Sequence, residues 1–314
     1  MLTDSEQEKP MMMIIANPLS GGGTGEKYAS AVEAALQEKG VLFSLKRTQY
    51  RGHAVKLAQE AAEQGCEAVV ALGGDGTFQE VVTGLGSCKA TVGFIAAGTG
   101  NDFIRTVGLP KDPLEALEVI LQGNTCGLDL LECGDGNRCL NIAGTGLDVE
   151  LLMRSIRYRK HVKSSLSYYL SLIVTLFSFS FRDFTVRVDG GEEKQFCAMM
   201  ISAANGRYCG GGLPVAPEAL CNDGKIDLII IRKLPRILLP YLFVRFLKGE
   251  LLSLRYAQCI RCEQVEINMK QPLPFNVDGE LIDGLPFTAR VLPNAVRMFC
   301  KAERKIKETQ RSDA

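Results

Sequence analysis

Short apolar runs and glycine-rich polar segments alternate along the first third of the chain. The apolar runs predict buried strands at residues 11–16, 41–45, 67–72 and 91–96. Apolar positions at helical spacing predict helices at residues 26–39, 52–64 and 78–85. Because strand, glycine loop and helix recur, we expect a parallel sheet with helices on both faces. Ligands of such sheets bind beyond the carboxyl ends of the strands, where the glycine loops must lie.

The pattern changes near residue 125 to shorter apolar stretches with β-branched residues and frequent turns. These stretches predict a second, mostly antiparallel domain, with strands at residues 184–188, 197–203, 226–231, 265–269 and 287–291. Two helical inserts are expected within it, at residues 164–181 and 234–252. The charged residues 301–314 are expected to form a frayed tail.

Length and charge narrow the class of protein. A chain of 314 residues favours two domains. Lysine plus arginine (36) equals aspartate plus glutamate (36), so nucleic acid is not an expected partner. The acidic, polar residues 1–10 do not resemble a secretory signal, and eleven scattered cysteines favour reduced thiols, so we expect a cytoplasmic protein. Cys259 and Cys262 form a lone CxxC pair whose role stays open.

Three glycine loops follow predicted strands. The first, at residues 17–25, contains Asn17, Pro18, Ser20 and Gly21, lacks the Gly-Lys-Ser/Thr of a Walker A loop, and alone is as typical of a tight turn as of a phosphate site. The second, Gly73-Gly74-Asp75-Gly76-Thr77, allows a phosphate chain to approach the backbone, although a sharp strand-to-helix turn is the alternative. Residues 98–102 repeat this chemistry one strand later. Together the loops predict a nucleotide site.

A wider set of motifs then resembles the diacylglycerol kinase catalytic family, and above all its small bacterial lipid kinases. To the three loops, which extend to Glu80 and Phe103, it adds Ala216-Pro217-x-Ala219, Asn222-Asp223-Gly224 and Val277-Asp278-Gly279-Glu280, in the family's order between residues 11 and 299. Two positions depart from the family pattern, because Gly22 stands where a basic residue is common and Ile104 where alanine is usual. Neither change removes a residue that the chemistry requires.

The resemblance implies a fold of class α/β plus β. A Rossmann-like (phosphofructokinase/NAD kinase-like) N-terminal domain at residues 1–128 would bind ATP. A C-terminal β-sandwich domain at residues 129–294 would bind lipid and Mg²⁺, and residues 295–314 would pack back on the first domain.

The resemblance also implies the site residues. Nucleotide contacts would come from the first loop and from Thr48, Gly74, Asp75, Gly76, Thr77, Phe78, Gln79, Glu80, Thr99, Asn101 and Asp102. The backbone carbonyls of Leu220 and Lys225, with the side chain of Asp223, would hold Mg²⁺. Glu280 would be the catalytic base, with Asp278 supporting it.

Without the other motifs, the Asp278-Gly279-Glu280 segment is compatible with two structures, an extended strand or a turn. In an extended strand both carboxylates would lie on one side, and a carboxylate near the acceptor hydroxyl can take its proton. Asp-Gly between apolar runs is equally a hairpin-turn signal.

The lipid partner rests on the resemblance and on the two inserts. Residues 164–181 are too short and too polar to span a bilayer, and residues 234–252, with Arg236, Arg245 and Lys248, suit an amphipathic interfacial helix or a core helix. A basic cluster precedes the first insert, at Arg154, Arg157, Arg159, Lys160 and Lys163. We expect peripheral contact with a membrane that carries the lipid substrate, and leave a homodimer open.

The expected reaction transfers the γ-phosphoryl group of ATP to a lipid hydroxyl, with diacylglycerol converted to phosphatidic acid as the favoured case. Phosphatidylglycerol, a sphingoid base or ceramide are alternative acceptors. An NAD kinase, which shares the Gly-Gly-Asp-Gly-Thr loop, and a catalytically silent lipid-binding protein are the rival interpretations.

Overall fold

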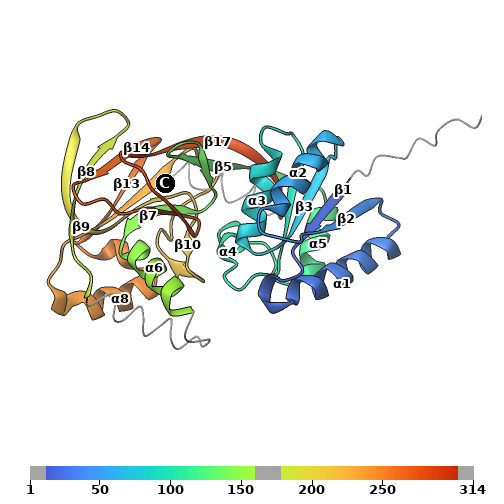
Figure 1. The fold of residues 1–314 in the computed structure, drawn as a ribbon, viewed down its shortest axis with the longest axis horizontal. Helices are drawn as coiled ribbons and strands as arrows, with labels where there is room; N and C mark the ends of the chain where they lie inside the picture. Colours follow the sequence, from blue (N-terminus) through green and yellow to red (C-terminus); the bar gives the residue numbers. More distant parts are fainter. Residues whose placement is uncertain (1–11, 160–177, 303–314) are drawn as a thin grey trace, which may run out of the picture. The chain divides into compact units, whose positions relative to one another are not determined.

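The computed structural model describes residues 12–159 and 178–302 (Figure 1). The chain divides into two compact units: unit 1 contains Met1–Leu128 and Asn294–Ala314, and unit 2 contains Asp129–Pro293. The chain passes between the units twice, once within strand β5 (Thr125–Cys133) and once within strand β17 (Phe287–Phe299).

Unit 1 is built on a parallel sheet with strand order β4-β3-β1-β2. The strands are β1 (Met12–Ala16), β2 (Phe43–Arg47), β3 (Ala68–Gly73) and β4 (Thr91–Ala96). The end of β17 adds a parallel pairing to β4 at Met298. Strands β1, β3 and β4 are buried along their whole length. Because both faces of these strands are covered, their sequences are continuous apolar runs. The expected parallel sheet is confirmed.

Helices cover both faces of this sheet (Figure 1). Helices α1 (Thr24–Glu38) and α5 (Pro113–Leu121) share one core with the strands through Val32, Leu36 and Leu117. Helices α2 (His53–Glu63) and α3 (Asp75–Leu85) pack against each other on the opposite face. A Cβ on Gly84 would lie 2.3 Å from the carbonyl oxygen of Val55, so only glycine permits this close approach of α2 and α3. Two short helical segments complete the unit, η1 (Ser20–Gly22) and α4 (Asp102–Val107).

One boundary differs from the prediction in a way that matters for the site. Helix α3 begins at Asp75, three positions before the predicted start at Phe78. The second half of the glycine loop, Asp75-Gly76-Thr77, is therefore the first turn of the helix, and it has no apolar residue at helical spacing that would predict a helix there.

Unit 2 is a β-sandwich, as expected. Its strands are β6 (Asn137–Cys139), β7 (Ile142–Gly146), β8 (Arg182–Val188), β9 (Glu193–Ala204), β12 (Ile226–Arg232), β13 (Ala257–Cys262), β14 (Gln264–Met269), β15 (Phe275–Val277) and β16 (Glu280–Ile282), with a separate pair β10 (Tyr208–Cys209) and β11 (Leu213–Pro214). Neighbouring strands pair antiparallel, and the long β9 pairs with β8 near its start and with β7 near its end. Between the layers lies a core that includes Phe184, Ile201, Leu228 and Phe275.

A second core lies on the outer side of β7, β9 and β12 and is covered by helices. These are α6 (Leu147–Arg159), η2 (Arg236–Leu238), α8 (Leu239–Leu247) and η3 (Leu251–Ser253). The predicted insert at residues 234–252 is thus a short helix between two 3₁₀ turns. The insert at residues 164–181 and the tail after residue 302 fall largely outside the described residues. Among the helices that the structure describes, none is long and apolar enough to cross a bilayer.

Candidate functional site

The three predicted glycine loops of unit 1 lie at the carboxyl ends of the neighbouring strands β1, β3 and β4, and side chains tie them together. The side-chain amide of Asn17 donates a hydrogen bond to Thr77 Oγ1 (3.3 Å). The Asp75 carboxylate accepts the backbone N–H groups of Asp102 (3.1 Å) and Phe103 (3.0 Å), which caps the start of α4. The structure therefore brings the predicted loops together.

Glycine serves different purposes within these loops. A Cβ on Gly98 would lie 2.6 Å from Gly74 Cα, and one on Gly21 would lie 2.3 Å from the Ala97 carbonyl oxygen, so both glycines allow loops to pack closely. Gly76 is different, because its φ lies outside the left-handed region and a Cβ there would meet no atom within 4 Å. Neither backbone strain nor packing within the protein accounts for glycine at this position, whereas close approach of a ligand would.

The start of helix α3 is suited to an anion. In the described part of the chain no side chain caps this helix, whose N-cap is Gly74. The first N–H groups of a helix lack intrahelical partners and carry the positive end of the helix dipole. The backbone of Asp75, Gly76 and Thr77 can therefore receive phosphate oxygens.

Two residues predicted to contact nucleotide, Glu80 and Phe78, have structural partners within unit 1. Glu80 accepts the N–H groups of Gly52 (3.0 Å) and Ala54 (3.2 Å), which caps α2. The Phe78 side chain is fully buried and stacks on Phe94 and Phe103 with ring centroids 4.5 and 5.1 Å apart, so a contact from Phe78 would have to come from its backbone.

The remaining predicted nucleotide residues lie around the same loops. Thr48 extends the pairing of β2 with β1 by donating its N–H to the Ala16 carbonyl (2.8 Å). Thr99 is exposed, and Asn101 adopts a left-handed conformation with φ of 52°. Pro18, Ser20 and Gln79 are half-buried.

In unit 2 the Asp278-Gly279 pair forms the turn of the β15–β16 hairpin, so the hairpin alternative is the one observed. Both residues have positive φ (48° and 94°), and Val277 pairs with Glu280 across the turn. The Gly279 N–H donates to Asn276 Oδ1 (2.9 Å), which fixes the turn further. Glu280 is exposed as the first residue of β16.

Asp278 does not stand beside Glu280 as a second carboxylate. Its Oδ2 accepts the N–H of Leu140 (2.6 Å), and its Oδ1 accepts those of Asn141 (3.1 Å) and Ile142 (3.0 Å). Burial raises the pKa of this carboxyl group to about 6 against these hydrogen bonds, which lower it. Asp278 therefore anchors the hairpin to the start of β7. It can support Glu280 by holding in place the hairpin that carries it.

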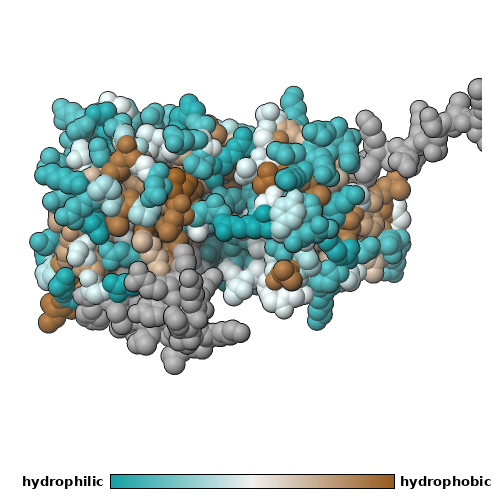
Figure 2. All heavy atoms as spheres, viewed as in Figure 1, coloured by the Kyte–Doolittle hydropathy of each residue, from teal (hydrophilic) through white to brown (hydrophobic). Residues whose placement is uncertain are grey.

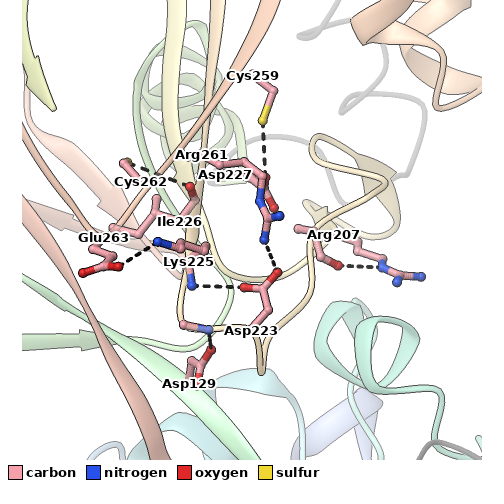
Figure 3. A network of polar contacts seen from close by, with 12 residues as sticks. Asp129, Arg207, Asp223, Lys225, Ile226, Asp227, Cys259, Arg261, Cys262 and Glu263 are labelled. Atoms are coloured by element: carbon pink, nitrogen blue, oxygen red, sulfur yellow. Dashed lines mark hydrogen bonds and ion pairs between the residues drawn. The ribbon is translucent and has the colours of Figure 1, made fainter. Parts of the chain in front are cut away.

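Asp223, the predicted metal ligand, is held on both sides (Figure 3). Its Oδ1 accepts the Lys225 N–H (3.0 Å), and its Oδ2 forms an ion pair with the Arg261 guanidinium, which also lies 3.6 Å from Asp227 Oδ1. Burial raises the pKa of Asp223, while Arg261 lowers it. A hollow of about 400 Å³ opens beside this carboxylate.

A chain of hydrogen bonds joins the Asp278 turn to the Asp223 loop. The buried Asn205 donates from Nδ2 to the carbonyls of Leu140 (2.7 Å) and Asp129 (2.9 Å). Asp129 in turn donates its N–H to the Cys221 carbonyl (2.8 Å) and accepts the Gly224 N–H at Oδ2 (2.7 Å). The hairpin that carries the predicted base and the predicted metal loop are thus joined by one polar network within unit 2.

Sequence reasoning missed Asp129, Asn205 and Arg261. The signal for the first is one charged residue inside the apolar strand Leu128-Asp129-Leu130-Leu131, since a buried charge needs a dedicated partner. The signal for the second is an asparagine directly after the apolar strand β9. Arg261 stands next to the predicted metal loop only because β13 pairs with β12 and sets it opposite Asp227.

The Asp223 loop fits a magnesium ion with few protein ligands. Carboxylate and carbonyl oxygens are the hard ligands that Mg²⁺ takes, and Mg²⁺ often keeps several waters beside one or two carboxylates. Within residues 12–159 and 178–302 no three histidine, cysteine or acidic side chains converge on a point that could hold a metal. Asp223 and the carbonyls of Leu220 and Lys225 would therefore be the ligands, and Arg261 would have to release Asp223.

Comparisons with known proteins identify related families. The diacylglycerol kinase catalytic domain family matches residues 11–133, and the YegS C-terminal NAD kinase beta sandwich-like domain family matches residues 141–300. A diacylglycerol kinase of Bacillus subtilis is 31% identical over 87% of this chain and 90% of its own length. A Yersinia enterocolitica protein named "Probable lipid kinase YegS-like" is 29% identical over 89% of this chain and 94% of its own.

The fold is shared with a solved structure. A crystal structure described as a diacylglycerol kinase of Bacillus anthracis superposes with a TM-score of 0.76, covers 95% of this chain and 100% of that one, and is 23% identical. Fold and matched domains define the class of this chain, a two-domain kinase. The chain belongs to the diacylglycerol kinase family of lipid kinases.

Proposed function

We propose that this protein transfers the γ-phosphoryl group of ATP to the hydroxyl of diacylglycerol at a membrane surface in the cytoplasm. The observation that carries the proposal is the network in unit 2 that fixes Glu280 and the Asp223 loop on one scaffold. Phosphoryl transfer needs a positioned acceptor oxygen, a proton acceptor and neutralised charge, and little other covalent work from the protein.

Each part of the chain has a role in this reaction. The N–H groups at the start of α3 bind phosphate oxygens, and Gly76 leaves room for them. Glu280 accepts the proton of the acceptor hydroxyl, and Asp278 and Asn276 hold the turn that presents it. A Mg²⁺ held by Asp223 with the Leu220 and Lys225 carbonyls supplies positive charge when bound.

Diacylglycerol is the proposed acceptor because a relative with 31% identity is named for that activity. Phosphatidylglycerol, a sphingoid base, ceramide and NAD are outcomes of the test. Purified protein is given labelled ATP with each lipid in mixed micelles, or with NAD in solution. The proposal expects the highest rate with diacylglycerol, and a higher rate with another lipid would reassign the acceptor.

The base is tested by Glu280→Gln, which keeps the shape of the side chain and removes its basicity. The rate of transfer should fall by about a hundredfold to ten-thousandfold, while the affinity for ATP stays unchanged. Glu192→Gln, an exposed glutamate in the turn between β8 and β9, is the matched control. Full activity of Glu280→Gln would refute the assigned base.

A further inference from the structure

Helix α8 of unit 2 is apolar on both its faces. Its inner face buries Leu239 and Leu242 in the second core, where Phe243 and Phe246 also pack. A helix that is apolar all round is ordinarily buried all round. Helix α8 instead lies at the outer edge of the strands of unit 2 (Figure 1), so its second face is not covered by these strands.

The outer face is a continuous apolar strip. Tyr241, Val244 and Leu247 are 54%, 49% and 50% exposed, and Ile237 of the preceding 3₁₀ turn is 86% exposed. Steps of three and four residues place these side chains along one side of the segment. Of the ten large apolar side chains exposed in the described part of the chain, these are four, so the clustering exceeds a random scatter.

The segment that carries the strip is rich in cations. Residues 232–255 contain six cations (Arg232, Lys233, Arg236, Arg245, Lys248 and Arg255) and a single carboxylate, Glu250, in a chain whose net charge is zero. Glu250 pairs with Arg245 at 2.9 Å. Lys233, Arg236 and Lys248 are exposed, and Arg236 and Lys248 are the sequence neighbours of Ile237 and Leu247. Figure 2 shows apolar and hydrophilic side chains together where α8 lies. Apolar residues flanked by cations are complementary to the headgroups and acyl chains of an anionic bilayer.

We propose that this surface, formed by Ile237, Tyr241, Val244 and Leu247 with the flanking cations, docks the protein on an anionic lipid bilayer. The inference deepens the proposed function, on which it rests, by naming the part of the chain that meets the membrane. The apolar side chains enter the boundary between headgroups and acyl chains, Tyr241 lies at headgroup level, and the cations contact lipid phosphates.

The docking surface connects to a predicted motif within the same unit. Helix α8 contacts β11, and a Cβ on Gly249 would lie 3.7 Å from Pro217 and 3.8 Å from Pro214. Ala216 and Ala219 lie in the same core as Leu239 and Leu242. Docking through α8 therefore holds the segment that leads to Leu220 and Asp223 at the membrane.

The test measures binding of the full chain to vesicles of phosphatidylcholine, with and without phosphatidylglycerol, by sedimentation at low and high salt. Wild type should bind the anionic vesicles more tightly, and salt should weaken this binding. The double variant Val244→Asp/Leu247→Asp should need about a hundredfold more lipid for the same bound fraction, about tenfold for each apolar side chain replaced. Leu42→Asp, 59% exposed in unit 1, is the matched control and should bind as wild type does.

Several outcomes would overturn the proposal. They are equal vesicle binding by wild type and the double variant, an equal loss in Leu42→Asp, or a wild-type dimer in sedimentation analysis that the double variant abolishes, which would make a second copy the occupant. The variants must also unfold at the wild-type temperature. Transfer to a short-chain diacylglycerol in detergent should survive in the double variant. If vesicles bind but no lipid is phosphorylated by wild type, docking stands and the kinase proposal fails.

Discussion

The glycine residues in the unit 1 loops differ in whether an added methyl group would meet other atoms of the protein. Gly76→Ala places a methyl group in open space within a helix, where alanine is favoured over glycine by up to about 1 kcal/mol, so the unfolding temperature should hold or rise. ATP should bind more weakly to this variant, because the methyl group lies where phosphate approaches. Thermal unfolding and nucleotide titration measure both effects.

Gly98→Ala is the matched contrast in the same site. Its added methyl group would lie 2.6 Å from Gly74 Cα, so the expected result is a lower unfolding temperature. An unchanged ATP affinity in Gly76→Ala would contradict the assignment of this loop to phosphate.

At the proposed magnesium site, Arg261 would compete with the metal for Asp223. The Asp223 carboxylate forms an ion pair with the Arg261 guanidinium, so it would have to leave this partner in order to hold Mg²⁺. Arg261→Gln removes this competitor, so added MgCl₂ should raise the unfolding temperature more in the variant than in the wild type. Arg187→Gln, which breaks an ion pair with Glu193 elsewhere in unit 2, controls for loss of charge. Equal responses to Mg²⁺, measured against NaCl of the same ionic strength, would exclude the metal site at Asp223.

Asp148 predicts a pH dependence of stability. Its Oδ1 is buried and accepts no hydrogen bond among the described residues, and burial raises the pKa of the carboxyl group to about 6. The folded chain keeps the proton that the unfolded chain releases near its ordinary pKa, so stability falls as the pH rises through about 6. Asp148→Asn should therefore raise the free energy of unfolding near about pH 8 by at most about 3 kcal/mol, and change it little near about pH 4. Urea unfolding measures the free energy of unfolding of the variant and the wild type at both pH values. An equal difference between the two proteins at the two pH values would contradict the assigned pH dependence.

Among the elements, the β15–β16 hairpin depends on a contact with a distant strand. Asp278→Ala leaves three backbone N–H groups at the start of β7 without their acceptor, which should lower the free energy of unfolding by about 3 kcal/mol. Asp278→Asn keeps one acceptor oxygen, so its free energy of unfolding should lie between those of the alanine variant and the wild type. Denaturant unfolding measures the series, and a loss below about 1 kcal/mol in the alanine variant would show that the anchor is dispensable.

Elements with a strong local pattern were predictable. Strands β1, β3 and β4 are continuous apolar runs, and a glycine loop follows each of them, so the sheet and the positions of the loops were predictable from the sequence. Strands of three residues, such as β15 and β16, are too short for a periodic signal. The length of β17 was missed because its last residues pair with a different unit from its first.

Residues whose partners are far away in sequence were not predictable. Asn205 bonds to a carbonyl 76 residues away, and Arg261 pairs with a carboxylate 38 residues away. Such contacts follow from strand pairing, which the sequence specifies only through the whole fold. The hydrogen bonds of Asp278 and Glu80 were not predictable for the same reason, because each carboxylate accepts backbone N–H groups from another element.

For the whole molecule, two units carry complementary chemistry. Unit 1 offers uncapped N–H groups and an unobstructed glycine, and unit 2 offers a proton acceptor, hard oxygen ligands and an apolar, basic surface. Two strands, β5 and β17, join them, and the net charge of zero hides a cationic segment at residues 232–255. The apolar, basic surface is the feature on which the proposed docking rests.

The most direct measurement of the central claim is transfer of the labelled γ-phosphoryl group from ATP to lipid by the full chain. In mixed micelles that contain diacylglycerol, with NAD present in solution as a competing acceptor, the label should appear in phosphatidic acid, depend on Mg²⁺ and be lost in Glu280→Gln. Label found in the NAD fraction alone, or in no acceptor at all, would contradict the assignment of this protein as a lipid kinase.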